Sequence, residues 1–416
     1  MNAFTWIFLS AVLIATGTRV WLASRHVRYI GSHRDAVPEP FAAQIDLAAH
    51  QKAADYSRAK TRLNMVGVSV DAVLLLALTL GGGFALLNGL AENWFGSGIA
   101  AGIALIALVV IVSAAVDLPF SAYKVFGIET RFGFNKMTPG MFVADLLKQA
   151  AVGAAMGLPL LLAVLWMMQR MGGLWWLWVW LVWMGFNLAV LAIYPTFVAP
   201  LFNKFSPMQD EELKARIEAL LTKCGFKSQG LFVMNGSRRS SHGNAYFTGF
   251  GKTKRIVFFD TLLSRLEPEE IEAVLAHELG HFKMNHVFRR MALTFAMSLG
   301  FLWVLGQLRS ATWFYEGLGV AAPAGDAMAL VLFFMVVPVF TFLLRPLMAM
   351  YSRKHEFEAD AYAARNASAT RLAQALVKLY KDNASTLTPD PLHSAFYDSH
   401  PPAAARIARL KSFASA

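Results

Sequence analysis

The stretch EPEEIEAVLAHELGHFKMNH spans residues 267–286 and carries the signals of a helix with a defined start. Pro268 suits the first turn, where its missing N–H is not needed, and the two glutamates that follow it favour the positive end of the helix dipole. On such a helix His277 and His281 are four residues apart, so both imidazoles project from one face. The stretch therefore predicts a helix that presents two histidines side by side.

Two histidines at this spacing can bind one metal ion, and Glu278, next to the first of them, can take a proton from an attacking water. This is the H-E-x-x-H arrangement of zinc hydrolases. Random placement of the 10 histidines and the glutamates of this 416-residue chain would produce the pattern roughly 0.008 times. A helix with two solvated histidines is the competing interpretation, but Ala276, Leu279 and Gly280 make the surroundings apolar and small. We therefore predict one zinc ion per chain.

A catalytic zinc ion takes three protein ligands and leaves one position for water, so the third ligand must come from another part of the chain. His286 is the nearest candidate in the sequence. On a continuous helix it would project about 140° away from His281, so we do not expect it to bind the same ion. Cys224 is the only cysteine, which excludes a thiolate metal site and leaves histidine or a carboxylate as the third ligand.

A second segment, SRKHEFEADAYAARN at residues 352–366, offers the missing carboxylate. Glu356 and Asp360 lie four residues apart on a predicted helix, so they share one face. We expect Glu356 to bind the zinc and Asp360 to hold the far ring nitrogen of a ligating histidine. Glu358 is the rival ligand, although it would project about 200° away from Glu356. Taken alone, this segment could also be a solvated acidic helix face.

The chain as a whole is too apolar for a soluble protein of its length. It is 56% hydrophobic and 16% charged, whereas soluble domains are about 25% charged. A membrane helix needs about 20 mostly apolar residues. The stretches that qualify are 3–23, 66–90, 98–120, 149–169, 174–196, 291–308 and 327–349. The first carries its arginines after the apolar run, the reverse of a signal peptide, so we expect seven retained membrane helices.

The distribution of lysine and arginine predicts how these helices are oriented, because cytoplasmic loops carry the excess. Residues 24–65 contain seven, 121–148 four, 197–290 fourteen and the chain from Arg345 onward ten, whereas the loops on the opposite side contain none, Arg170 and Arg309. We therefore expect the N-terminus outside and both large polar segments in the cytoplasm. The net charge of +11 is thus a topology signal, and nucleic acid is not an expected partner.

Two further segments have features of a substrate-binding site. Residues 244–250, NAYFTGF, and the KTKRIVFFD that follows are predicted to form two strands around Gly249 and Gly251. A strand with a free edge can hold an extended peptide by backbone pairing, and Asn244 could cap that pairing. An ordinary hairpin is the alternative. In SHPPAAARIARL, His400 precedes two prolines and Arg406 lies on the helix that they start.

Six blocks of the sequence together resemble, in order and spacing, the type I CAAX prenyl endopeptidases, which are integral-membrane zinc metalloproteases that trim prenylated proteins. The blocks are AYKVFGIETRFGFNKMT (122–138), YPTFVAPLFNKFSPM (194–208), SSHGNAYFTGF (240–250), HELGH (277–281), EFEAD (356–360) and SHPP (399–402). They cover the chain from about residue 120 to 410.

This resemblance implies a mainly α-helical fold. Seven membrane helices would form a barrel around a chamber, with a gluzincin-like α+β zinc protease domain on the cytoplasmic side. The expected divisions are residues 1–196 for the first five membrane helices, 197–290 for the catalytic region with the zinc-binding helix, 291–349 for the last two membrane helices, and 350–416 for the C-terminal catalytic region.

The resemblance also implies the roles of the site residues. It places zinc on His277, His281 and Glu356, with Glu278 as general base and Asp360 behind a ligating histidine. Asn244 and Arg406 would then contact the substrate, and His400 would act as a second catalytic residue that donates to the transition state.

The substrates implied are peptides or C-terminal segments of proteins, including lipidated ones. They would be cleaved inside the chamber of this protein, which lies in the lipid bilayer. The compact chain, rich in Ala, Leu and Arg, indicates a bacterial homologue in the inner membrane; a eukaryotic member would lie in the endoplasmic reticulum membrane. Because bacteria do not generally prenylate such proteins, quality control of membrane proteins is an alternative role.

Two other classes of function are alternatives to proteolysis. A binding or transport protein for lipid or peptide would explain Asp71, a charged residue inside a membrane span. A proteolytically inactive receptor would be expected to lack Glu278 or a metal ligand. The complete hydrolytic set favours an enzyme over both.

The loop charges generate a testable topology. We expect cysteines introduced near Gly96 and Gly317 to react with a membrane-impermeant thiol reagent in intact cells, and a cysteine near Ser237 to react only after the membrane is permeabilised. Labelling near Ser237 from outside would contradict the charge argument.

Overall fold

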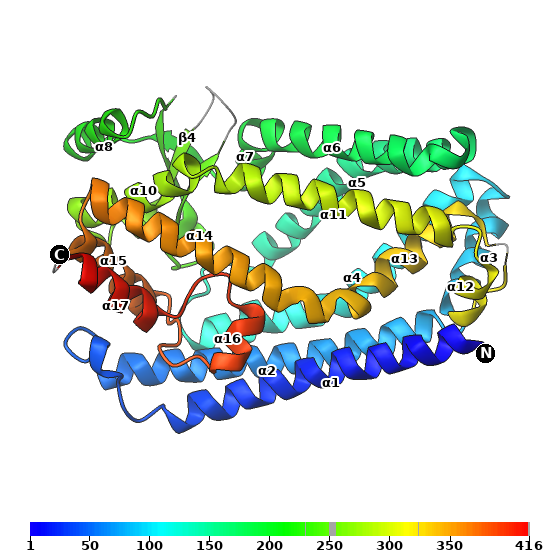
Figure 1. Cartoon of the computed structure of the whole chain (residues 1–416), viewed down its shortest axis with the longest axis horizontal. Helices are drawn as coiled ribbons and strands as arrows, with labels where there is room; N and C mark the ends of the chain where they lie inside the picture. The colour runs from blue at the N-terminus through cyan, green and yellow to red at the C-terminus, as the bar shows by residue number, and fades with distance from the viewer. Residues whose placement is uncertain (229, 249–254, 323, 415–416) are drawn as a thin grey trace.

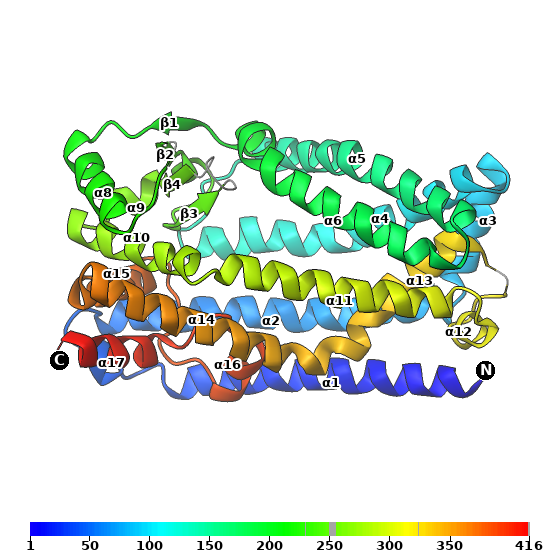
Figure 2. The same cartoon turned by 45° about the horizontal axis from the view of Figure 1, so that its top comes forward.

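The computed structural model describes residues 1–228, 230–248, 255–322 and 324–414. Long helices lie side by side along the longest axis of the molecule, with the small sheet and the C-terminus at one end and the N-terminus at the other (Figure 1). A second view shows that these helices are arranged around the long axis in more than one layer (Figure 2). The molecule therefore has a helical membrane part and, at one end, a domain of helices and strands that we call the polar domain.

Seven helices among the described residues are long and apolar enough to cross a membrane, which confirms the predicted number. They contain α1 (Ala3–Ser32), α2 (Leu47–Leu78), α4 (Ile99–Ala122), α5 (Pro139–Arg170), α6 (Trp175–Ile193), α11 (His286–Leu308) and α13 (Gly325–Thr341). A 3₁₀ turn, Phe342–Leu344, joins α13 directly to α14 (Arg345–Asn366). The last membrane helix therefore continues into the polar domain.

The predicted second span, 66–90, is wrong at its C-terminal end. Helix α2 ends at Leu78, and the chain turns through Gly82, whose φ of 79° lies in the left-handed region, before α3 begins at Gly83. A Cβ at Gly81 would lie 2.6 Å from the Ala77 carbonyl oxygen. Apolar residues continue on both sides of this turn, so hydropathy does not reveal it.

The other helical segments are shorter. They are α3 (Gly83–Phe95), α7 (Ala199–Phe202), α8 (Glu211–Lys223), α9 (Asp260–Leu263), α10 (Pro268–Lys283), α12 (Thr312–Gly317), α15 (Ala369–Asp382), α16 (Pro391–Tyr397) and α17 (Ala403–Ala414), with 3₁₀ turns at Glu39–Phe41, Gly172–Leu174 and Gly236–Arg238 and π-helical segments at Tyr123–Glu129 and Tyr194–Val198. Helix α10 begins at Pro268 as predicted, and the Glu270 carboxylate accepts a hydrogen bond from the Glu267 amide at 2.8 Å.

Among the described residues the sheet has four strands in the order β1-β2-β4-β3, formed by Phe205–Pro207, Leu231–Met234, Ala245–Thr248 and Arg255–Phe259 in chain order. Strands β2 and β4 are parallel, and β3 and β4 are antiparallel with Ala245 opposite Phe258. This pairing confirms the predicted two strands, while the connecting residues 249–254 lie outside the described residues. Among the described strands, β3 is at the edge of the sheet.

Helices α10 and α14 pack closely in the core of the polar domain. A Cβ at Gly280 would lie 3.0 Å from the Ala359 Cα and 3.1 Å from the Tyr362 Cβ. Ala359 is fully buried, and Ala276 and Leu279 of α10 are fully buried as well. The two helices can lie this close only because glycine occupies position 280.

Candidate metal centre

Three potential metal ligands meet where α10 faces α14. His277 and His281 project from α10 and Glu356 projects from α14, and each offers a donor atom within 4.8 Å of the others. The His277 and His281 Nε2 atoms are 3.3 Å apart. Each lies 3.4 Å from a Glu356 carboxylate oxygen. The structure thus brings together the three residues that the sequence singled out.

These distances fit a zinc ion. Ligand atoms about 2.0–2.1 Å from a tetrahedral ion lie about 3.3–3.4 Å from one another. The Glu356 side chain is almost fully buried, and its Oε2 atom accepts no hydrogen bond from the described residues. A buried carboxylate oxygen without a donor is costly unless a cation occupies the adjacent position. The donor set therefore suits a metal ion between the two helices.

Asp360 and Arg406 lie behind this group rather than in front of it. The Asp360 Oδ1 atom is 2.9 Å from His277 Nδ1. The Arg406 guanidinium donates to both Asp360 oxygens, at 2.9 and 2.6 Å. Arg406 is only 5% exposed, so its fork is directed at the carboxylate and not into a cavity. This placement differs from the expectation that Arg406 contacts the substrate.

Glu278 is also held in a largely buried environment. Burial raises the pKa of its carboxyl group, and the neighbouring imidazoles of His277 and His281 oppose that shift. The same helix thus supplies both histidines and a carboxyl group that lies within their electrostatic reach.

His400 lies beside the Glu356 carboxylate of the ligand group. Its Nε2 atom lies 3.4 Å from Glu356 Oε2, and 59% of its side chain is exposed. It lines a cavity of about 300 Å³ together with Tyr380 and Tyr397. The imidazole therefore lies next to the candidate metal position and remains accessible.

Arg353 fixes the segment that carries His400, and sequence reasoning missed it. Its Nη1 atom donates to the carbonyl oxygens of Ser394, Ala395 and Asp398 at 3.2, 3.4 and 2.9 Å. Arg353 is three residues before Glu356 on α14, so one helix supplies a ligand and holds the His400 loop. Its place in the SRKHEFEAD segment was visible, but its partners about 40 residues away were not.

Asn244 lies at the start of edge strand β3. Its carbonyl oxygen accepts a hydrogen bond from the Phe259 amide at 3.0 Å, and its exposed side chain accepts from the Ala245 amide at 2.8 Å. Phe247 of the same strand packs against Phe282 of α10, with ring centroids 5.0 Å apart. The edge strand is therefore next to the helix that carries both histidines.

A second group of donors, which the sequence did not reveal, lies beside the first. It consists of His286, His355 and Glu358. His286 does not point away from His281, because Asn285 adopts a left-handed backbone with φ of 57° and breaks the helix between α10 and α11. The His286 and His281 Nδ1 atoms are 3.0 Å apart. The expected 140° separation applied only to an unbroken helix.

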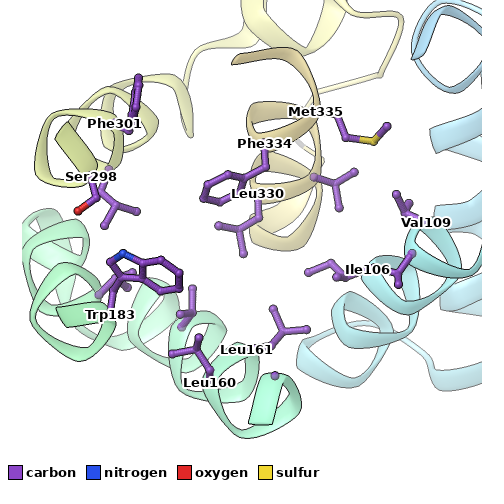
Figure 3. Close-up of a pocket in the computed structure, with 16 residues that line it drawn as sticks. Ile106, Val109, Leu160, Leu161, Trp183, Ser298, Phe301, Leu330, Phe334 and Met335 are labelled. Atoms are coloured by element: carbon purple, nitrogen blue, oxygen red, sulfur yellow. The ribbon is translucent and has the colours of Figure 1, made fainter. Parts of the chain in front are cut away.

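Two larger cavities lie in the membrane part. Asp71 lines a polar cavity of about 460 Å³ with Asp117, Lys124 and His393, which gives this intramembrane charge charged and polar neighbours. A second cavity of about 420 Å³ is lined almost entirely by aliphatic and aromatic side chains from α4, α5, α6, α11 and α13 (Figure 3).

Two family models match consecutive parts of the chain. Residues 26–204 match the model of the CAAX prenyl protease N-terminal part, which is described as having five membrane helices. Residues 207–414 match peptidase family M48.

Individual proteins match as well. The chain is 35% identical over 399 residues to CAAX prenyl protease 1 of Saccharomyces cerevisiae, covering 88% of this chain and 86% of the relative. It is 40% identical over 298 residues to a CAAX prenyl protease 1 homolog of Arabidopsis thaliana, covering 71% and 70%, and 33% identical over 348 residues to the Homo sapiens homolog, covering 73% and 72%.

The crystal structure of S. mikatae Ste24p is similar at a TM-score of 0.92, covers 99% of both chains and is 30% identical in sequence. The similarity extends over the membrane helices and the polar domain alike. The predicted seven-helix chamber fold and the predicted family are thereby confirmed. The chain belongs to peptidase family M48, as an integral-membrane metalloendopeptidase of the CAAX prenyl protease type.

Proposed function

We propose that the protein cleaves peptide bonds at one zinc ion held by His277, His281 and Glu356. The observation that carries this proposal is a pair of histidine Nε2 atoms 3.3 Å apart, each of which lies 3.4 Å from a different oxygen of the buried Glu356 carboxylate. One of these oxygens, Oε2, accepts no hydrogen bond among the described residues. Glu358, the rival ligand, instead accepts a hydrogen bond from His286, with 2.8 Å between Nε2 and Oε2.

When bound, zinc supplies a Lewis acid that polarises the peptide carbonyl and makes water a better nucleophile. Glu278 takes the proton from the attacking water and passes it to the leaving amine. Its raised pKa suits this role, because a carboxyl group that is too acidic holds a proton poorly. His400, exposed and 3.4 Å from Glu356, donates to the oxyanion that develops on the carbonyl.

Asp360 and Arg406 orient the metal site. Asp360 accepts from His277 Nδ1, which leaves Nε2 free to bind the ion. Arg406 holds both oxygens of Asp360 and compensates its buried charge. Arg406 thus acts through Asp360 and not on the substrate, whereas Asn244, exposed at the start of the edge strand, contacts the substrate backbone.

The substrates are peptides or C-terminal protein segments, including lipidated ones. Several relatives are named CAAX prenyl proteases. The apolar cavity of Figure 3 supports lipid binding, since Ile106, Leu161 and Phe334 line it and Ser298 is its only hydroxyl-bearing residue. Helix α11 begins beside the candidate metal ligands and passes this cavity. The distance along its axis from His286 to Ser298 is about 18 Å. An apolar chain attached to a peptide near the metal would have an apolar cavity within that reach.

The bilayer is the setting of the reaction. We place the N-terminus outside and the polar domain in the cytoplasm, in the inner membrane of a bacterium or the endoplasmic reticulum membrane of a eukaryote. The lysine and arginine excess in residues 197–290 and in the C-terminal tail supports this orientation.

The base is tested by Glu278→Gln. Turnover of a short peptide should fall by about 10²–10⁴-fold, because the amide cannot accept the proton. Zinc content should stay at one per chain, whereas Glu356→Ala should lose the metal. Metal analysis and peptide hydrolysis with the purified full-length proteins measure both effects. Near-wild-type cleavage by Glu278→Gln would rule out this role.

The oxyanion donor is tested by His400→Ala. We expect kcat to fall by about 10²–10³-fold, with little change in peptide Kd because the hydrogen bond strengthens only as charge develops. Ser399→Ala should lower kcat less, because the Ser399 hydroxyl only supports the far ring nitrogen, His400 Nδ1, at 3.0 Å and its loss leaves Nε2 in place. An unchanged kcat with weaker peptide binding would show that His400 merely positions the substrate.

Arg406→Met separates a supporting role from substrate contact. It should destabilise the protein by about 3–5 kcal/mol, because Asp360 is left as a buried and uncompensated charge. Arg409→Met, an exposed position on the same helix, should have little effect. Thermal unfolding and zinc content measure the difference. A folded, zinc-loaded Arg406→Met protein with only a raised KM would instead indicate that Arg406 contacts the substrate.

A further inference from the structure

A chain of hydrogen bonds runs from the candidate metal ligand His281 to a second carboxylate. His281 Nδ1 lies 3.0 Å from His286 Nδ1, and His286 Nε2 lies 2.8 Å from Glu358 Oε2. His286 is 1% exposed and is the first residue of α11. The three side chains therefore link α10, α11 and α14 in series.

Which nitrogen donates in each of these hydrogen bonds follows from the position of the candidate metal ion. His281 Nε2 faces Glu356 and His277, so a metal bound there leaves the proton of His281 on Nδ1. That N–H donates to His286 Nδ1. His286 then carries its own proton on Nε2, from which it donates to Glu358. Both nitrogens of both rings are thus used, and a single tautomer of each ring satisfies the chain.

The two histidine ligands are supported in different ways. His277 donates directly to Asp360, which Arg406 holds. His281 has no such direct contact with a carboxylate on its Nδ1 side among the described residues, and His286 fills that place. A carboxylate supports each ligand, once directly and once through a second imidazole.

We propose that His286 and Glu358 are positioning residues for His281 and set the zinc affinity of the site. This inference rests on the proposed zinc centre and goes beyond it, because neither residue binds the ion. Hydrogen bonds to the far nitrogen of a ligating histidine fix its tautomer and ring orientation and raise its basicity as a ligand, and their loss typically costs about 10–100-fold in metal affinity.

The backbone supports this role. Asn285 adopts a left-handed conformation with φ of 57°, which turns the chain between α10 and α11. This turn returns His286 to the face of α10 that carries His281. Asparagine is one of the few residues besides glycine that adopts the left-handed conformation readily, so the residue at position 285 suits the turn.

A second metal ion on His286, His355 and Glu358 is the competing interpretation of the same residues. Their donor atoms lie within 4.8 Å of one another, and His355 Nδ1 has no hydrogen-bond partner among the described residues. However, the rings of His286 and His355 stack with centroids 4.0 Å apart and an angle of 9°. Lone pairs in parallel planes do not converge on one ion, and both nitrogens of His286 already have partners.

Zinc affinity of the purified full-length protein, measured against a competing chelator at fixed pH, tests the proposal. The variants are His286→Leu, His286→Gln, Glu358→Ala, Glu358→Gln and the double variant His286→Leu/Glu358→Ala. Lys354→Gln is the matched control, because Lys354 is an exposed neighbour of Glu358 at 4.0 Å. Thermal unfolding of the metal-free proteins accompanies each measurement.

We expect His286→Leu and Glu358→Ala each to weaken zinc binding by about 10–100-fold. The double variant should be no weaker than His286→Leu, since the residues act in series. Glu358→Gln should retain most of the affinity because its amide oxygen still accepts from His286, and Lys354→Gln should match the wild type. With zinc at saturation, the KM of the single variants should be unchanged.

Several outcomes would overturn the proposal. Unchanged zinc affinity in Glu358→Ala would show that the chain does not support the ligand, even if the His286 variants fail to fold. Additive losses in the double variant would show that the two residues act separately. Two zinc ions per wild-type chain and one in Glu358→Ala would assign the group as a second metal site. A wild-type protein that binds no zinc would instead contradict the proposed metal centre itself.

Discussion

The close approach of α10 and α14 at Gly280 and Ala359 is the contact on which the candidate site depends. The ligands from α10 precede two membrane helices in the chain, and the ligand from α14 follows them. A Cβ at position 280 would lie only 3.0 Å from the Ala359 Cα. Because glycine has no Cβ, the two backbones can lie near enough for their side chains to share one ion. A larger residue there would separate the histidines from Glu356 before it affected any membrane helix.

That contact also creates an electrostatic problem, because it buries several charged groups together. Glu356 and Asp360 lie among apolar side chains, and unpaired charges there would be costly. Arg406 compensates Asp360 with two short hydrogen bonds. Glu356 lies farther from the same guanidinium, 3.9 Å from Arg406 Nη1, and its Oε2 atom accepts no hydrogen bond among the described residues. The metal and the protein fold are therefore expected to stabilise each other. The buried charge of Asp360 is therefore compensated by the protein itself, whereas that of Glu356 is compensated fully only when a metal ion binds.

The sequence predicted those parts of the site in which partners lie a few residues apart on one helix. His277 and His281 follow from their spacing on α10, and Glu356 and Asp360 from the same spacing on α14. The helix start at Pro268 and the strand pair β3–β4 also follow from local chemistry.

The parts that were missed depend on breaks in helices and on distant partners. His286 was assigned the wrong direction because the left-handed Asn285 is invisible to helical periodicity. The end of α2 was placed too late because glycines interrupt an apolar run without changing its hydropathy. Arg353 was not predicted, and Arg406 was predicted without its partner Asp360. Both bind partners 41 to 46 residues away, and no local pattern identifies such contacts.

The direct continuation of α13 into α14 has a consequence for how such a chain can change over time. No loop separates the last membrane helix from Glu356, because only the 3₁₀ turn Phe342–Leu344 intervenes. Inserting one residue between Arg345 and Glu356 would rotate the carboxylate by about 100° and carry it away from α10. Substitutions on the lipid-facing side of this segment are tolerable, but insertions and deletions are not. Insertions and deletions are therefore expected only in loops elsewhere in the chain. The number of residues between Arg345 and Glu356 sets the distance from the bilayer to the metal site.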